Sequence, residues 1–208
     1  MLPDNNFKRL KPSFYTQNCR IVAQSLLGKI LVHQVNDQTL SGIIVETEAY
    51  CDFHAADLAC HGSRNNGRPT KRTAVMFGEA GHAYVYLNYG IHWLFNVVTG
   101  ETGQASAVLI RALEPVSGFE EMQQNRGKQP QKNWTNGPGK LAQALGINQS
   151  HNKQNLCRPN SVIWIVDRDN LSTSEICCGP RIGLGKTPEP WLSMPWRYWI
   201  KNNPYVSK

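Results

Sequence analysis

A β-hairpin pattern between His82 and Val98 constrains the fold of this chain more than any other feature. From His82 to Leu87, a histidine and two tyrosines occupy alternate positions, with aliphatic residues between them. Such period-two alternation is typical of a strand with two different faces. Asn88–Gly90 interrupts the pattern before Ile91–Val98 resumes it, which predicts a tight turn in which glycine can take a positive φ. The chain is therefore expected to pair strands in the antiparallel sense.

Other strand-like runs surround this hairpin, and helical segments are few. Further strands are predicted at Lys29–Val35, Gly42–Tyr50, Ala105–Leu113, Val162–Asp167, Arg181–Gly185 and Trp196–Lys201. Helices are predicted at Ser13–Leu27, Phe119–Asn125 and Pro138–Leu145, with at most one short helix, His54–Cys60, in the irregular stretch 51–72. Strands that rarely alternate with long helices argue against a doubly wound parallel sheet. We predict an α+β fold: a single domain, 1–208, around a curved, mostly antiparallel, open-barrel-like β-sheet with peripheral helices and a protruding hairpin.

The balance of charges suggests a polyanionic partner. The formal net charge is +7, which fits nucleic acid or an anionic membrane surface but equally fits a solvated basic surface. The basic residues are gathered in two loop-like stretches, which contain Arg64, Arg68, Lys71 and Arg72, and Arg126, Lys128, Lys132 and Lys140. Basic loops suit contacts to phosphates, which position a protein on DNA without reading its sequence.

Other classes of protein find little support. The N-terminus lacks the apolar run of a signal peptide, and no stretch approaches the roughly 20 apolar residues of a membrane span. We therefore expect a soluble intracellular protein with no membrane partner. The six cysteines show no CxxC spacing and are expected to be buried thiols rather than disulfides. Cys51, His54, Cys60 and His61 lie close together, but their spacing matches no standard zinc finger, so neither a metal nor a cofactor is predicted.

Two carboxylates at the end of an apolar run are candidates for catalysis. Period two places Glu46, Glu48 and Tyr50 on one face of the strand. A carboxylate partly buried beside an aromatic ring can serve as a general base. The alternative is a solvated polar face of the strand.

Aromatic residues near the hairpin suggest contacts with nucleobases. Tyr89 at the tip could act as a wedge between base pairs. Tyr50, Tyr84 and Tyr86 could offer faces on which a base stacks. The alternative is that these tyrosines pack in the core with their hydroxyls at its edge.

Six segments, in order, carry a resemblance to a known family. They are Val45–Tyr50, Met76–Phe77, His82–Gly90 followed by Asn96, Leu109–Pro115, Asn136–Leu141 and Gly179–Gly183. In this order they resemble the alkyladenine (3-methyladenine) DNA glycosylases, and the match extends over nearly the whole chain. The resemblance implies a monofunctional DNA glycosylase of base-excision repair, which flips alkylated or deaminated purines from duplex DNA and leaves an abasic site.

The resemblance also implies roles for individual residues. Glu48 would activate the attacking water as general base, and Arg111 would help to hold that water, with the main chain near His61 assisting. The flipped base would lie between Tyr50 and Tyr86. His61 would contact the edge of the base.

Further roles concern selectivity and DNA contacts. Asn96 would exclude normal guanine by clashing with its amino group, and Tyr89 would fill the space that the base vacates. Contacts to the DNA backbone are expected from Arg64, Lys71, Arg72 and Lys140. The expected partner is double-stranded DNA with a damaged purine, bound by a monomer. The location would be the cytoplasm in a bacterium and the nucleus in a eukaryote.

The sequence leaves the lesion open among 3-methyladenine, 7-methylguanine, hypoxanthine and ethenoadenine. A slot lined by tyrosines suits cationic alkylated purines, which gain cation–π energy of roughly 0.5–2 kcal/mol. Two other functions are the alternatives: a non-catalytic nucleic-acid-binding module, and a metal-dependent hydrolase that uses the Cys/His cluster.

Overall fold

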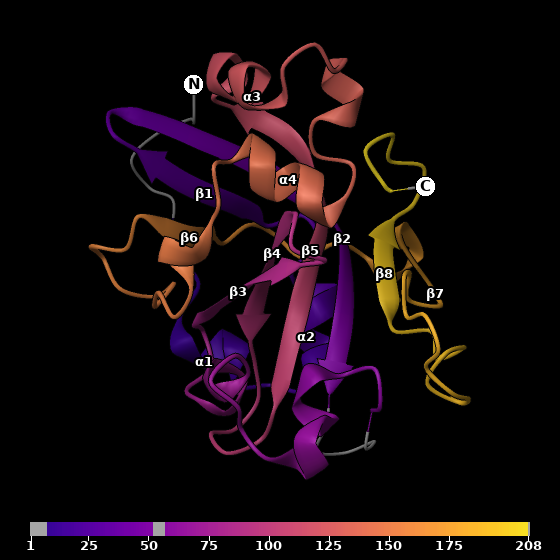
Figure 1. The fold of residues 1–208 in the computed structure, drawn as a ribbon. Helices are drawn as coiled ribbons and strands as arrows, with labels where there is room; N and C mark the ends of the chain where they lie inside the picture. Colours follow the sequence, from indigo (N-terminus) through magenta and orange to yellow (C-terminus); the bar gives the residue numbers. More distant parts are fainter. Residues whose placement is uncertain (1–7, 52–56, 208) are drawn as a thin grey trace.

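The computed structural model describes residues 8–51 and 57–207, and its strands form one curled antiparallel sheet (Figure 1). The strands are β1 Ile30–Val35, β2 Gln38–Cys51, β3 Ala83–Asn88, β4 His92–Val98, β5 Ser106–Ser117, β6 Ile163–Val166, β7 Ile176–Gly179 and β8 Arg197–Ile200. Their order is β3-β4-β5-β2-β1-β6, and β8 joins β7 to β2. This architecture confirms the predicted α+β class and the predicted hairpin.

The sheet branches along β2, its longest strand. One edge of β2 pairs with β5, whereas the other edge pairs first with β1 as far as Ile43 and then with β8 opposite Glu46–Glu48. The register with β5 shifts on both sides of Glu46. Such bulges bend a strand and increase its twist. The bend therefore falls at the segment that carries the two candidate carboxylates.

Short helices cover the sheet. They are α1 Pro12–Tyr15, α2 Cys19–Ser25, α3 Phe119–Arg126 and α4 Pro138–Ala144, with single 3-10 turns at His61–Ser63, Asn65–Gly67, Ala74–Phe77, Gln131–Asn133, Gln149–His151 and Thr173–Glu175. The predicted helix 13–27 is two helices: α1 ends at Tyr15, and Asn18 caps the start of α2 by accepting a hydrogen bond from the Arg20 backbone N. Helix α2 packs against β2 and β5, and α4 packs against β4 and β5.

Three sequence-based expectations are wrong or lie outside the described residues. Arg181–Gly185 is an irregular loop, and the strand predicted there lies earlier, as β7. The turn at 57–60 is not helical, and 54–56, the rest of the proposed helix His54–Cys60, lie outside the described residues. Cys19 and Cys51 are joined in a disulfide between α2 and the end of β2, although all cysteines were expected as thiols. Both cysteines are buried.

A small apolar cluster supports the aromatic face of the hairpin. Buried side chains of Met76, Tyr84 and Ala107 belong to it, and Tyr50 and Tyr86 pack against it while remaining partly exposed. In the described part of the chain, no helix is long and apolar enough to cross a membrane.

Candidate active site

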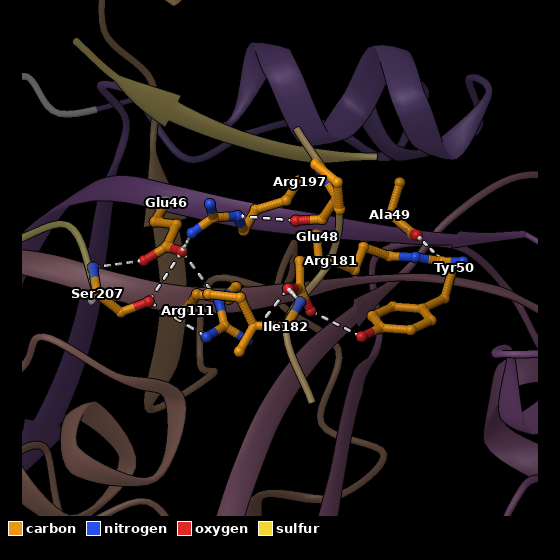
Figure 2. A network of polar contacts seen from close by, with 10 residues as sticks. Glu46, Glu48, Ala49, Tyr50, Arg111, Arg181, Ile182, Arg197 and Ser207 are labelled. Carbon is orange, nitrogen blue, oxygen red and sulfur yellow. Dashed lines mark hydrogen bonds and ion pairs between the residues drawn. The ribbon is translucent and has the colours of Figure 1, made fainter. Parts of the chain in front are cut away.

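Glu48 is completely buried near the end of β2, and three groups hold its carboxylate (Figure 2). The backbone N–H of Ile182 donates to Oε1 at 2.7 Å, and Nη1 of Arg111 lies 3.2 Å from the same oxygen. The hydroxyl of Tyr50 donates to Oε2 at 2.7 Å. A carboxylate offers about four acceptor positions. These contacts occupy two positions on Oε1 and one on Oε2, so Oε2 retains one position for a further donor.

Glu46 is also fully buried, but its contacts are more numerous. Its Oε1 accepts from Nε of Arg111 at 3.0 Å, from Nη1 of Arg197 at 3.1 Å and from Oγ of Ser207 at 2.9 Å. Its Oε2 accepts from the backbone N of Ser207 at 2.8 Å. Figure 2 shows this carboxylate facing Ser207, on the side away from Tyr50. Such saturation suits a structural carboxylate that joins β2, β5, β8 and the C-terminal segment.

Arg111 on β5 links the two carboxylates. Burial by itself would lower the pKa of Arg111, but the charges of Glu48 and Glu46 outweigh burial and raise that pKa. The guanidinium is therefore a permanent cation between two carboxylates. Its fork geometry lets one side chain bind both groups at once.

A cavity of about 330 Å³ opens beside this network. Its size lies near the lower end of the roughly 300–1,000 Å³ that is usual for small-molecule sites. The residues expected to contact the base or fill the vacated space all line it: Tyr50, His61, Tyr86, Tyr89 and Asn96. Arg111, expected to hold the attacking water, lines it too. Glu48 is not part of the wall, whereas Tyr50, Arg111 and Ile182, which hold its carboxylate, are. The catalytic candidate thus lies one residue layer behind the cavity surface.

His61 lies on the hairpin side of the cavity. Its Nδ1 is 2.8 Å from the hydroxyl oxygen of Tyr84, and its ring meets the Tyr86 ring edge-on with 4.7 Å between centroids. Burial, followed by the charges of Arg64 and Arg72, lowers the pKa of His61 to about 4. The imidazole is therefore neutral at physiological pH, where it can donate one hydrogen bond and accept another.

Local packing explains how the chain places His61 there. The His61–Ser63 turn lies close against the start of β5, and a Cβ at Gly62 would overlap the Cβ of Ala105. Asn96 is fixed on β4, where its Nδ2 donates to the backbone oxygen of Tyr84 at 3.0 Å. Both base-binding candidates are thus held by neighbours before any ligand arrives.

Tyr50 is held between Glu48 and a second buried ion pair. Burial, followed by the charge of Glu48, raises the pKa of Tyr50 well above its ordinary value. The guanidinium carbon of Arg181 lies 4.7 Å from the centroid of the Tyr50 ring. Arg181 donates to both carboxylate oxygens of Asp57, at 2.6 and 2.9 Å, and to the backbone oxygen of Ala49 at 3.0 Å. This arginine therefore fixes the end of β2 to the segment that precedes His61.

The hairpin tip presents Tyr89 to solvent. Its side chain is 86% exposed, and both Tyr89 (φ 50°) and Gly90 (φ 74°) take left-handed backbone conformations. A tyrosine in that region carries some backbone strain, whereas glycine does not. The structure thus shows the predicted turn, in which Tyr89 as well as Gly90 takes a left-handed conformation.

The four candidate backbone contacts have different surroundings. Arg64 lines the cavity, and Lys71 is exposed. Lys140 is exposed and donates from Nζ to Oδ1 of Asn136 at 2.9 Å. Arg72, by contrast, stacks on Tyr86, with its guanidinium carbon 4.6 Å from the ring centroid.

The Cys/His cluster is dispersed. Cys51 forms a disulfide with Cys19, and His61 forms a hydrogen bond with the hydroxyl of Tyr84. His54 lies outside the described residues. Within 8–51 and 57–207, no three His, Cys, Asp or Glu side chains are grouped in a way that could hold a metal ion.

Comparison with known proteins assigns the chain. The family model described as methylpurine-DNA glycosylase matches residues 13–204. The chain belongs to the methylpurine-DNA glycosylase family. The resemblance noted from the ordered motifs is thereby confirmed, and so is the prediction of a DNA glycosylase, a hydrolase of N-glycosyl bonds.

Similar proteins match this methylpurine-DNA glycosylase family member almost end to end. A relative from Myxococcus xanthus is 44% identical, over 96% of this chain and 93% of its own length. One from Bacillus mycoides is 46% identical over 95% of this chain and 98% of its own, and one from Carboxydothermus hydrogenoformans is 43% identical over 96% and 98%. All three are provisionally named 3-methyladenine DNA glycosylases.

Some residues of this glycosylase site were not expected from the sequence. Ile182 donates to Glu48, Arg181 packs on Tyr50 and is paired with Asp57, and Arg197 and Ser207 hold Glu46. The segment Gly179–Gly183 was noted as a motif, yet the overlapping Arg181–Gly185 was predicted as a strand. Ser207 had no signal, because one serine near the end of a chain forms no pattern.

Proposed function

We propose that this glycosylase extrudes a damaged purine from duplex DNA into the cavity and hydrolyses its N-glycosidic bond with a water that Glu48 activates. The observation that carries the proposal is the acceptor position left on Oε2 of the buried Glu48, behind Tyr50 and Arg111 in the cavity wall. A water entering between these groups could donate to that oxygen. General base catalysis of this kind contributes roughly 10²–10⁴-fold.

The reaction would proceed with a balanced transfer of one proton. The bond from C1′ to the base nitrogen breaks with oxocarbenium-like character, and the electron pair leaves with the base. The water oxygen bonds to C1′ and gives a proton to Glu48, and an abasic site remains. A cationic alkylated base leaves as the neutral base, whereas an uncharged base leaves as an anion that takes up one proton. The buried carboxylate also stabilises the positive charge that develops on the sugar.

A water nucleophile makes the enzyme monofunctional. The sequence offers Lys140 as an amine nucleophile. In the structure, however, the Lys140 side chain is exposed and its Nζ donates a hydrogen bond to Asn136. We therefore propose hydrolysis without cleavage of the DNA backbone. Trapping of a covalent protein–DNA adduct by borohydride would show that this part of the proposal is wrong.

The hairpin and the basic loops would bind the duplex. Extrusion of a base costs a few kcal/mol, and Tyr89 would offset part of that cost by filling the vacated space. Arg64, Lys71 and Lys140 would contact phosphates, and Asn96 would exclude the amino group of guanine. The protein would act as a monomer on double-stranded DNA. The relatives from bacterial organisms favour the cytoplasm as its location.

An excision assay tests the proposal directly. Duplexes that each carry 3-methyladenine, 7-methylguanine, hypoxanthine or ethenoadenine are incubated with the wild type and with Glu48→Gln. We expect release of at least one base by the wild type, a loss of about 100-fold or more in the variant, and retained binding of lesion DNA by that variant. Binding without excision by the wild type would favour the non-catalytic module, and loss of activity in EDTA would favour the metal-dependent hydrolase.

A further inference from the structure

Both tyrosines proposed to enclose the base already carry a guanidinium on one ring face. Arg72 lies 4.6 Å from the centroid of Tyr86, and Arg181 lies 4.7 Å from that of Tyr50. The two tyrosines line the cavity, but neither arginine does. The rings of both tyrosines therefore contribute to the cavity wall, and each has a guanidinium next to it that is not part of that wall.

The two arginines differ in how their charges are balanced. Arg181 is buried and forms a bidentate pair with Asp57, at 2.6 and 2.9 Å. Arg72 is exposed, and none of the ion pairs among the described residues involves it or Arg64. The positive charge next to Tyr86 is therefore unbalanced within the described part of the protein.

The surroundings of His61 respond to this charge. After burial, Arg64 and Arg72 are the causes that lower its pKa to about 4. Both arginines thus oppose a second positive charge at the hairpin side of the cavity. A cationic base between Tyr50 and Tyr86 would meet the same opposition.

Cation–π attraction depends on the negative potential of a ring face. The guanidinium of Arg72 already uses part of the potential of the Tyr86 ring, and its charge also acts on a base that stacks on that ring. We propose that Arg72 is a specificity-determining residue that disfavours cationic N-methylated purines relative to uncharged damaged purines, such as deaminated or etheno-bridged ones. This inference rests on the proposed function, and it reverses the expectation that the tyrosine slot favours cationic bases.

The charge of Arg72 would change the excision rates of charged and uncharged lesions by different factors, so it would change the ratio of those two rates. Loss of a phosphate contact slows the excision of every lesion by a similar factor. Loss of the charge next to Tyr86 changes the excision rates of charged and uncharged lesions by different factors. The measurement is therefore the ratio of single-turnover rate constants for 7-methylguanine and hypoxanthine, in duplexes of one sequence at neutral pH. The uncatalysed loss of each base is subtracted.

Three variants separate charge from other causes. Arg72→Gln removes the charge, Arg72→Lys keeps it, and Arg68→Gln removes an exposed charge from the same loop. We expect Arg72→Gln to raise the ratio of 7-methylguanine to hypoxanthine excision about threefold to fivefold, from the usual strength of an exposed cation–π pair. Arg72→Lys and Arg68→Gln should leave the ratio within about twofold of the wild type.

Each outcome decides a separate question. A ratio unchanged in Arg72→Gln, with both rates reduced equally, would overturn the inference and make Arg72 a phosphate contact. An equal rise of the ratio in Arg68→Gln would also overturn it, because the effect would then come from the general charge of the loop. A wild type that releases none of the four damaged bases of the excision assay would refute the proposed function itself.

Discussion

Nη1 of Arg111 lies 3.2 Å from Oε1 of Glu48, and both side chains are buried. The same guanidinium binds Glu46 through Nε, so one cation serves two carboxylates. Removing one partner of a buried charge network leaves a charge without compensation. Under the proposed function, stability and catalysis are therefore linked at Arg111.

Arg111→Met should lower the free energy of unfolding by about 3 kcal/mol, because Glu46 and Glu48 both lose their shared cation. Arg111→Lys should recover part of this loss, although an ammonium cannot reproduce the fork that binds both carboxylates. Urea denaturation of the three proteins measures the difference. A methionine variant as stable as the wild type would show that Arg197 and Ser207 suffice.

Glu46 and Glu48 should separate stability from catalysis. Glu46→Gln loses a carboxylate that accepts four hydrogen bonds, which should cost about 2 kcal/mol of stability. Its folded fraction should still excise bases within about threefold of the wild type, whereas Glu48→Gln should lose about 100-fold or more. Single-turnover excision and urea denaturation test this. Equal losses of activity would show that Glu46 takes part in the chemistry.

Tyr89→Ala should impair DNA handling without affecting the fold. Because the side chain is 86% exposed, the stability should change by less than about 0.5 kcal/mol. Excision from duplex DNA should fall by about tenfold, given roughly 1–3 kcal/mol for a base–aromatic stack. Ile91→Ala, at the same hairpin tip and 70% exposed, is the matched control. A larger loss in the control would argue against Tyr89 as the wedge.

A buried histidine pair should make the protein sensitive to acid. Nδ1 of His33 lies 2.6 Å from the backbone oxygen of Leu145, and its Nε2 lies 2.9 Å from Nε2 of His151. Nδ1 of His151 accepts from the backbone N of Asn148 at 3.1 Å. When both rings are neutral, Nδ1–H of His33 donates to Leu145 and Nε2–H of His151 donates to His33.

Burial lowers the pKa of both His33 and His151 in the folded protein. The unfolded chain therefore binds more protons below its histidine pKa of about 6.5, so stability should fall as the pH drops below that value. His61, whose pKa burial lowers to about 4, adds to the same trend. Urea denaturation between neutral and mildly acidic pH should show a smaller slope for His33→Gln than for the wild type. Equal slopes would contradict the role of the pair.

The pair of Asp57 and Arg181 should behave as one unit. Asp57→Asn leaves a buried guanidinium beside Tyr50 without its carboxylate, which should cost about 3–5 kcal/mol. Arg181→Met combined with Asp57→Asn should cost less than the sum of the single changes, because no uncompensated charge remains. A double-mutant cycle by urea denaturation measures this coupling. Additive losses would show that the two side chains act independently.

Local patterns were sufficient to predict the hairpin, most strands and the common face of Glu46, Glu48 and Tyr50. These features depend on the period of a strand and on the residues of a turn, which lie within a few positions of one another. Errors arose where a local signal was ambiguous. Arg181–Gly185 looks like a short strand, yet it forms the loop that delivers the Ile182 N–H to Glu48.

Tertiary structure alone decided how each carboxylate is used. Ile182 lies 134 positions from Glu48, and Ser207 lies 161 positions from Glu46. Both contacts depend on the bulge in β2 and on β8 taking the place of β1 beside it. The order of residues determines which side of a strand a carboxylate faces. Which donors surround that carboxylate is decided by segments that meet only after the sheet has curled.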